Sequence, residues 1–323
     1  MRVRILLQAR ALDRGAAPAT MVGMKHAPAK ILCALWIACL QLPACGGDAS
    51  APQSFPTGPA PKDGIQTDYW DAAHTRKKVQ GEARAGKPIG DWVWWYEDGQ
   101  QQKAAHYENG ELQGPSVEWH PKGVKKAESV FANGKPNGPA KEWYPSGKLQ
   151  REGMMADGRQ EGHWITYHPT GEKAIDGEFK AGRQEGHFVS WHPNGKKSSE
   201  GDYTSGLMTG PWKTWHAGGT VEKEGVFVDG KNDGTWTRWY ESGKVQETGV
   251  FKLGVPDGAF ETRSPSGALL SAGMYVAGKR EGPWTYTKDD GTPDPQKSGV
   301  YAADLRTGDL PAVAPPADSG VKK

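Results

Sequence analysis

Histidine recurs at one position of a periodic sequence, which raises the question of a metal centre. The four residues are His120, His168, His192 and His216. Zinc needs several ligands around one ion, each at ~2.0–2.1 Å. If each copy of the period is a β-hairpin, equivalent residues lie two strands apart, at ~9–10 Å, so they cannot converge on one ion. Tyrosine shares the position, and His163 and His187 are separated in the same way. We therefore expect no metal site.

Catalytic groups are also sparse. The sequence has no phosphate-binding loop and no serine–histidine–aspartate order at a nucleophile elbow. Its cysteines are Cys33, Cys39 and Cys45, all before the periodic region. Asp289 and Asp290 form a carboxylate pair that recurs nowhere else, whereas acid–base catalysis needs two positioned groups facing one cleft. We expect neither an enzyme nor a cofactor.

Tryptophan gives the stronger signal of a binding function. The candidate binding aromatics share one repeat position and are Trp95, Trp119, Trp143, Trp191, Trp215 and Trp239. A second aromatic stands three residues before most of them, and this odd spacing places the two rings on opposite faces of a regular strand. A bulge would bring both rings to one face. Exposed rings of this kind can stack on sugars or hold quaternary ammonium groups.

Glycine sets the frame that must position these rings. One column steps by 24 residues through Gly90, Gly114, Gly138, Gly162, Gly186, Gly210, Gly234, Gly258 and Gly282. A second follows the same step through Gly99, Gly123, Gly147, Gly171, Gly195, Gly219, Gly243, Gly267 and Gly291. A fixed period of this size indicates a repeat array. Each copy holds two short runs rich in aromatic and β-branched residues, which predicts strands.

Two turns separate the runs. The first is Tyr-Pro-Ser-Gly at 144–147 and its equivalents, which predicts a type I turn with a left-handed glycine exit, joining a hairpin with a bulge. The second is predicted over residues 156–162, with both of its glycines in the turn. A third column, which includes Gly153 and Gly177, lies inside the second run, and we expect an aromatic ring of the adjacent strand over each glycine. The fold class is therefore all-β, an elongated single-layer antiparallel meander of about ten 24-residue hairpins over 67–305.

The pattern Gly-x-Trp-x-x-Trp/Tyr, x-Pro-x-Gly, Glu/Asp-Gly-x-Tyr/Phe-x-x-Gly resembles the variant MORN repeat of bacteria, over roughly residues 67 to 301. The same repeats occur in proteins catalogued as the YwqK-type toxin–antitoxin antitoxin family. This resemblance implies a twisted hairpin sheet, without catalytic residues in the repeat, that recognises protein or membrane partners. The chain departs from the pattern at Ser116, Ala140 and Arg263, where aromatics are expected.

The first 44 residues differ from the array and predict a secretory signal peptide. Lys25 and Lys30 precede an apolar run that is too short for a comfortable membrane span. Leu-Pro-Ala-Cys at 42–45 resembles a lipobox, which implies a lipid on Cys45 and export to the cell envelope, and Gly46 favours the outer membrane. An ordinary cleaved signal is the alternative. A start at Met21 or Met24 would make 1–20 a misread start. Residues 45–66 predict a Pro/Gly tether, and 306–323 a disordered tail.

Charge narrows the class of partner. Six of the 40 Lys and Arg and one of the 38 Asp and Glu lie in residues 1–44, which leaves a mature net charge of −3. This gives no support for nucleic-acid binding by a basic surface. We expect an interaction scaffold that binds a protein partner, with toxin neutralisation as one form, and contacts the membrane through the Cys45 lipid. The alternative is binding of a glycan or other envelope ligand through the tryptophans.

Overall fold

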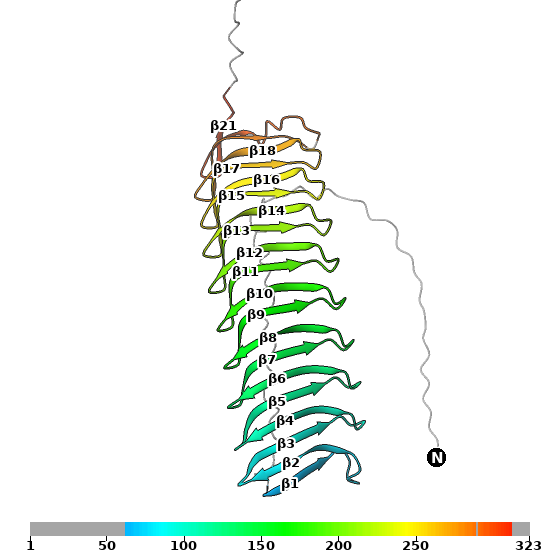
Figure 1. Cartoon of the computed structure of the whole chain (residues 1–323). Helices are drawn as coiled ribbons and strands as arrows, with labels where there is room; N and C mark the ends of the chain where they lie inside the picture. The colour runs from blue at the N-terminus through cyan, green and yellow to red at the C-terminus, as the bar shows by residue number, and fades with distance from the viewer. Residues whose placement is uncertain (1–61, 289, 312–323) are drawn as a thin grey trace, which may run out of the picture. The chain divides into compact units, whose positions relative to one another are not determined.

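The computed structural model describes residues 62–288 and 290–311 and contains 21 strands in one antiparallel meander, each paired with the next along the chain (Figure 1). This confirms the predicted fold class. The strands are β1 Gly64–Tyr69, β2 Lys77–Arg84, β3 Lys87–Trp95, β4 Gln101–Glu108, β5 Glu111–Trp119, β6 Lys125–Ala132, β7 Lys135–Trp143, β8 Leu149–Ala156, β9 Arg159–Tyr167, β10 Lys173–Lys180, β11 Arg183–Trp191, β12 Lys197–Thr204, β13 Leu207–Trp215, β14 Val221–Val228, β15 Lys231–Trp239, β16 Val245–Lys252, β17 Val255–Arg263, β18 Leu269–Val276, β19 Lys279–Tyr286, β20 Gly299–Ala302 and β21 Leu305–Gly308.

The sheet is slightly longer than the predicted array. It begins at Gly64 and ends at Gly308, compared with the expected 67–305. Cys45, the predicted signal peptide and most of the predicted tether and tail lie outside the described residues. Among the residues described, no helix has the length and apolarity needed to cross a membrane.

The turn between successive copies is shorter than the sequence predicted. β8 and β9 are joined by Asp157 and Gly158 alone, with φ of 49° and 79°. Two successive residues at positive φ form the type I′ turn that matches strand twist, and glycine fits its second position. The prediction of a turn over 156–162 was wrong, because residues 159–162 already belong to β9.

The leading glycine column lies inside strands and forms bulges. Gly162 has φ of +66° and open space where a Cβ would stand, so the backbone conformation rather than crowding requires glycine. The pairing of β8 with β9 shifts register between Glu152 and Met154, opposite this residue. Each copy therefore has a built-in kink that bends the strand next to the tight turn.

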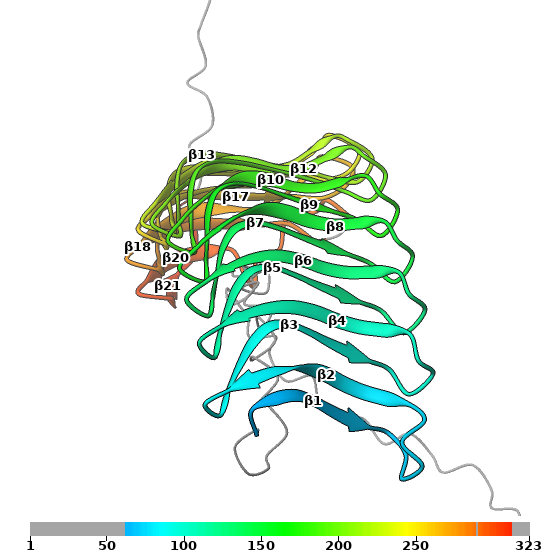
Figure 2. The same ribbon diagram turned by 60° about the horizontal axis from the view of Figure 1, so that its bottom comes forward.

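The proline turns have the predicted geometry. Gly147 N–H donates to the Tyr144 carbonyl over 2.8 Å, Gly147 has φ of +84°, and the β7–β8 register shifts at Trp143. Tight turns line one margin of the sheet and these five-residue turns line the other (Figure 2). We call them the tight-turn margin and the proline-turn margin.

Aromatic rings cover the mid-strand glycines, as predicted. A Cβ on Gly153 would stand 2.3 Å from the Trp164 ring, and one on Gly225 would stand 2.2 Å from Trp236. The indole N–H of Trp164 donates to the Met154 carbonyl over 2.9 Å, which fixes the ring across the neighbouring strand. Edge-to-face contacts join such rings in sequence from Phe179 to Trp236 and again from Phe251 to Trp284. We call the side that carries this ladder the aromatic face.

Candidate binding surface

The six candidate tryptophans lie on the side opposite the aromatic face, which we call the charged face. Trp164 covers Gly153, whereas Tyr167, the residue at the candidate position of the same copy, donates its hydroxyl to Glu152 over 3.0 Å. Gly153 and Glu152 are adjacent in one strand, so they face opposite sides. The odd spacing therefore places the rings on opposite faces, and no bulge brings them together. The candidates are all half-buried: Trp95, Trp119, Trp143, Trp191, Trp215 and Trp239.

Lysine ammonium groups lie near four of these rings. The pairs are Lys77 with Trp95, Lys125 with Trp143, Lys173 with Trp191 and Lys197 with Trp215, at 5.7–5.9 Å from nitrogen to ring centroid. Three of these lysines also form ion pairs with the acid three residues on, for example Lys197 with Glu200 at 2.9 Å. Lysines of the chain itself therefore already make cation–π contacts with four of the six candidate tryptophans. Sequence reasoning missed this pairing, although lysine recurs in the column.

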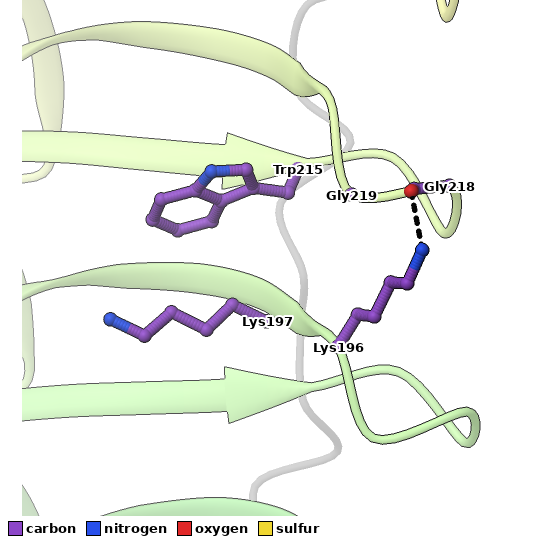
Figure 3. Close-up of a pocket in the computed structure, with 5 residues that line it drawn as sticks. All are labelled: Lys196, Lys197, Trp215, Gly218 and Gly219. Carbon is purple, nitrogen blue, oxygen red and sulfur yellow. Dashed lines mark hydrogen bonds between the residues drawn. The ribbon is translucent and has the colours of Figure 1, made fainter.

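The surface around Trp215 differs from that of the other candidates. A depression of about 420 Å³ is lined by Lys196, Lys197, Trp215, Gly218 and Gly219 (Figure 3). This proline turn has lost its proline and carries glycine where other copies carry a side chain. Lys196 Nζ donates to the Gly218 carbonyl over 2.7 Å, so one lysine holds the turn while the other lies beside the ring. The site combines an aromatic wall, two cations and exposed backbone.

The recurring histidines have a structural role. His216 Nε2 lies 2.9 Å from the carbonyl oxygen of Trp239, in the next copy, and His120 Nε2 stands 2.9 Å from that of Trp143. Tyr144 donates its hydroxyl to the equivalent carbonyl over 2.8 Å. Histidine and tyrosine alternate because both can donate to this acceptor, with the histidine proton on Nε2. The part of the chain that the structure describes contains no cluster of three His, Cys, Asp or Glu able to hold a metal.

The tight-turn margin is also bonded from copy to copy, but its donors point to the preceding copy. Gly230 N–H donates to the Met208 carbonyl over 2.9 Å, and Leu253 N–H donates to Asp233 Oδ1 over 3.0 Å. At residues 253–254 both amides of the turn bond to the preceding copy, since Gly254 N–H also donates to the Asn232 carbonyl over 2.7 Å. Together with the His/Tyr column, these bonds run along the array and satisfy turn groups that a lone hairpin would leave to water.

Exposed apolar side chains gather on the charged face at the C-terminal half of the tight-turn margin. Seven of them are between 37 and 53 % exposed: Leu207, Val226, Val228, Leu253, Val255, Met274 and Val276. We call this set the apolar margin. Val226 follows Gly225, whose open side meets Trp236, so Val226 points to the charged face. At the repeat positions of Val228 and Val255, earlier copies carry Lys180 and Arg183.

Two half-buried charged residues, Lys223 and Glu247, lie on the aromatic face beside the ring ladder. Lys223 Nζ stands 4.2 Å from the centroid of the Trp236 ring, and burial lowers the pKa of this ammonium to about 8. Burial raises the pKa of the Glu247 carboxyl to about 7, and its Oε1 accepts no hydrogen bond from the described residues. The sequence pattern did not single out this group, because Lys223 and Glu247 stand at one repeat position that varies from copy to copy and carries Lys103, Arg151, Ile175 and Ser199 in earlier copies.

Comparison with known proteins identifies the repeat. No curated protein matches the chain. Two of the similar solved structures are crystal structures of TcdB2-TccC3-Cdc42 and TcdB2-TccC3-TEV, at 11 % and 13 % identity with TM-scores of 0.18 and 0.17. Each match covers 69 % of this chain, which spans only 14 % of their length. The model of the MORN repeat variant matches residues 136–157, 184–204 and 232–253, which are the hairpins β7–β8, β11–β12 and β15–β16. At these three hairpins the chain carries the MORN repeat variant.

Proposed function

We propose that this chain is a binding scaffold held at the cell envelope, where the hairpin array offers an interaction surface to a protein partner and performs no catalysis. MORN repeats generally serve in contacts with proteins or membranes. The observation that carries the proposal is the apolar margin, because contiguous exposed apolar side chains typically mark protein–protein contact sites.

The test replaces the apolar margin with residues that the fold already accepts. Val228→Lys and Val255→Arg introduce what Lys180 and Arg183 provide at the same repeat positions, so folding should be unaffected. A protein captured from an envelope extract by the parent chain, identified and purified, should bind the double variant at least tenfold more weakly. Lys180→Val with Arg183→Val is the matched control and should retain binding. Equal binding of the parent and the double variant to every captured protein would remove the apolar margin from the proposal.

Anchoring rests on Cys45, which lies outside the described residues. We expect a fatty-acid probe to label the chain in cells and the label to disappear in Cys45→Ala. Labelling that persists in this variant would place the lipid elsewhere, and a secreted, unlabelled parent chain would support the ordinary cleaved signal.

Toxin neutralisation is a narrower form of the same function, suggested by the resemblance to the antitoxin repeats. It predicts that the captured partner is toxic when produced alone and harmless when produced with this chain. A partner without toxicity would leave the scaffold in place and exclude the antitoxin role.

Glycan binding is a second candidate function, favoured by the depression at Trp215. A sugar ring can stack its C–H groups on the indole while hydroxyl groups bond to Lys196, Lys197 and backbone carbonyls, which is the mixture of apolar walls and a few polar groups found in ligand sites. Peptidoglycan fragments should change the tryptophan fluorescence of the parent chain, and the change should be lost in Trp215→Ala. Trp239→Ala, at the same position of the next copy, is the control. An unchanged parent spectrum would rule this candidate out.

A further inference from the structure

The two end strands of the sheet differ in how well they are closed. β21 has four residues, and Arg306 within it donates through Nε to the Ser298 carbonyl over 3.0 Å and through Nη2 to the Pro295 carbonyl over 3.3 Å. β1 has six residues, Gly-Ile-Gln-Thr-Asp-Tyr, and neither end strand contains proline or lysine. Short strands are a usual means of blocking a sheet edge, so within the described sheet the longer β1 is the less protected end.

The turn geometry shows which groups of β1 point outward. The two-residue turn at 85–86 makes Arg84 and Lys87 a hydrogen-bonded pair, so the N–H and C=O of Ala83 point the other way, toward β1. Ala83 is opposite Gly64, and Gly81 is opposite Gln66. Gly64 and Gln66 therefore face β2. The alternation of an antiparallel ladder then directs the amide and carbonyl groups of Ile65 and Thr67 away from the sheet.

We propose that β1 pairs antiparallel with β1 of a second copy of this chain, around a two-fold axis through Thr67. The assembly is a symmetric dimer with one continuous sheet, the isologous contact that most homodimers use. Outward amides of Ile65 and Thr67 in each copy then meet carbonyl acceptors of the other. The proposal concerns assembly and stands independently of the protein or glycan partner proposed above.

The side chains of β1 are self-complementary in this register. Thr67 lies opposite Thr67, and Ile65 lies opposite Tyr69 on the same face. Thr–Thr pairs and pairs of a β-branched with an aromatic residue both stabilise antiparallel sheets. Ile65 is 73 % exposed in the single chain, so the pairing would cover it. On the other face Asp68 meets Gln66, which keeps the two carboxylates from lying directly opposite each other.

The neighbouring register is less favourable. If the axis passed through Gln66, Ile65 would lie opposite Thr67 and Tyr69 would lie opposite Asp63, beyond the end of the strand. Asp68 already accepts the Tyr69 N–H over 2.9 Å, so this amide is satisfied within the chain. The amides of Ile65 and Thr67 are the outward donors of β1 that no other residue of the described part pairs with. Dimerisation would also place two binding surfaces in one particle, which raises avidity for any clustered partner.

Sedimentation equilibrium of the full chain tests the proposal. We expect a concentration-dependent mass that reaches twice the 35.0 kDa of one chain. Thr67→Pro removes the central outward amide, and proline is tolerated on an edge strand when its missing N–H faces away from the sheet. Ile65→Lys places a charge on the paired edge at an already exposed position. Both variants should weaken the dimer at least tenfold, whereas Thr67→Val, which keeps the amide and the branched side chain, should keep it within about twofold.

A cysteine cross-link tests the register. In a hydrogen-bonded antiparallel pair the Cα atoms of Thr67 and its mate would be ~5.5 Å apart, within the range a disulfide spans. Thr67→Cys should give a covalent dimer on oxidation, well in excess of the parent chain with its own three cysteines. Asp68→Cys, whose mate is Gln66, should give no such excess. A monomer at every concentration, or a dimer that survives both Thr67→Pro and Ile65→Lys, would overturn the proposal.

Discussion

The hairpins of β6–β8 and those of β11–β16 share one 24-residue repeat but differ in whether they bury aromatic side chains. From residue 117 to residue 163 no side chain is fully buried. In the other region Phe188, Trp212, Trp236 and Phe251 are each at most 8 % exposed. Both regions have the same tight turns, proline turns and longitudinal hydrogen bonds. The hairpins can therefore stack through backbone hydrogen bonds and the contacts at the two margins without buried rings. Where rings are present, they add a hydrophobic core.

The missing rings and the missing glycines coincide. Ser116 replaces a ring and lies opposite Ala105, and Ala140 replaces a ring and lies opposite Ser129. Where the ring is present, the residue beneath it on the preceding strand is glycine, because a Cβ there would overlap the ring. Where it is absent, glycine would only weaken the strand, by about 0.5–1 kcal/mol. Trp94 and Leu112 are buried near the first bare interface, whereas the second has no such replacement. We therefore expect backbone amides of β6–β8 to exchange with solvent before those of β11–β16.

The largest expected effect is loss of a ring from the laddered region. Trp236 is 3 % exposed, contacts Phe227, and donates its indole N–H to the Val226 carbonyl over 3.0 Å. Trp236→Ala should lower the free energy of unfolding by about 3–5 kcal/mol, since it removes a large buried side chain and leaves a cavity. Urea unfolding followed by circular dichroism measures the change.

A matched substitution at a bare interface should have a small effect. Ser116 occupies the position of Trp236 in an earlier copy, and Ser116→Ala should change the unfolding free energy by less than about 1 kcal/mol. Equal losses for Trp236→Ala and Ser116→Ala would mean that the rings do not distinguish the laddered interfaces from the bare ones.

The next largest effect comes from adding a methyl group beneath a ring. Gly153→Ala should cost about 1–3 kcal/mol, because the new Cβ would overlap Trp164 and force the ring or the backbone to shift. The measurement is again urea unfolding, compared with Ser129→Gly, because Ser129 pairs with Ser116 and Ala140 and not with a ring.

A double substitution separates crowding from strand propensity. Trp164→Ser alone should be strongly destabilising, but Trp164→Ser with Gly153→Ala reproduces the Ala–Ser pair that the chain already has at 105 and 116. The alanine should then be neutral or stabilising in the background of the serine. If Gly153→Ala costs the same with and without the ring, the coincidence of the two columns has another cause.

A contact can be predicted from the sequence when both of its partners are marked by residue type. The ring over Gly153 could be predicted, because glycine and aromatic columns recur together. The His/Tyr column could not be assigned, because its acceptor is the carbonyl of Trp239 or Trp143, and a carbonyl has no sequence signature. The turn over 156–162 was misjudged because Gly158 and Gly162 look alike in sequence, while one forms a turn and the other a bulge.

The candidate site was predictable in position but not in environment. Alternation along a strand placed Trp215 and its equivalents on one face, yet their lysine neighbours come from the preceding copy. The depression at Trp215 depends on glycine at residue 218, a departure from the repeat that becomes meaningful only next to the ring. The apolar margin was missed because its seven members are spread over four repeat positions and lie side by side only around the tight turns.

A smaller effect concerns the charges that the laddered region buries. The pKa of Glu247 is about 7 in the folded chain against 4.5 for an ordinary glutamate, so the folded state binds the proton more tightly than the unfolded state. This contribution to stability is complete below pH 4.5 and is lost as the pH rises through about 7. Allowing for solvent screening, the parent chain should lose about 1–2 kcal/mol more than Glu247→Gln between pH 5 and pH 8.

Urea unfolding at several pH values measures this difference between the two chains. Glu111→Gln, which removes an exposed carboxylate from another copy, is the matched control for the loss of one acidic group. A pH profile of Glu247→Gln that overlays the parent's would show that the buried charges beside the ladder do not titrate as the structure indicates.

The smallest effect should be equal in the two regions. His216→Phe keeps an aromatic ring but removes the hydrogen bond to the Trp239 carbonyl, and His120→Phe does the same at Trp143. Each should lower the free energy of unfolding by about 1 kcal/mol. His216→Tyr and His120→Tyr should be nearly neutral, since Tyr144 already makes this bond. The longitudinal bonds are common to both regions, so the two losses should be equal. If His120→Phe lowered the free energy of unfolding several times more than His216→Phe, the margins would contribute more to stability where the rings are missing.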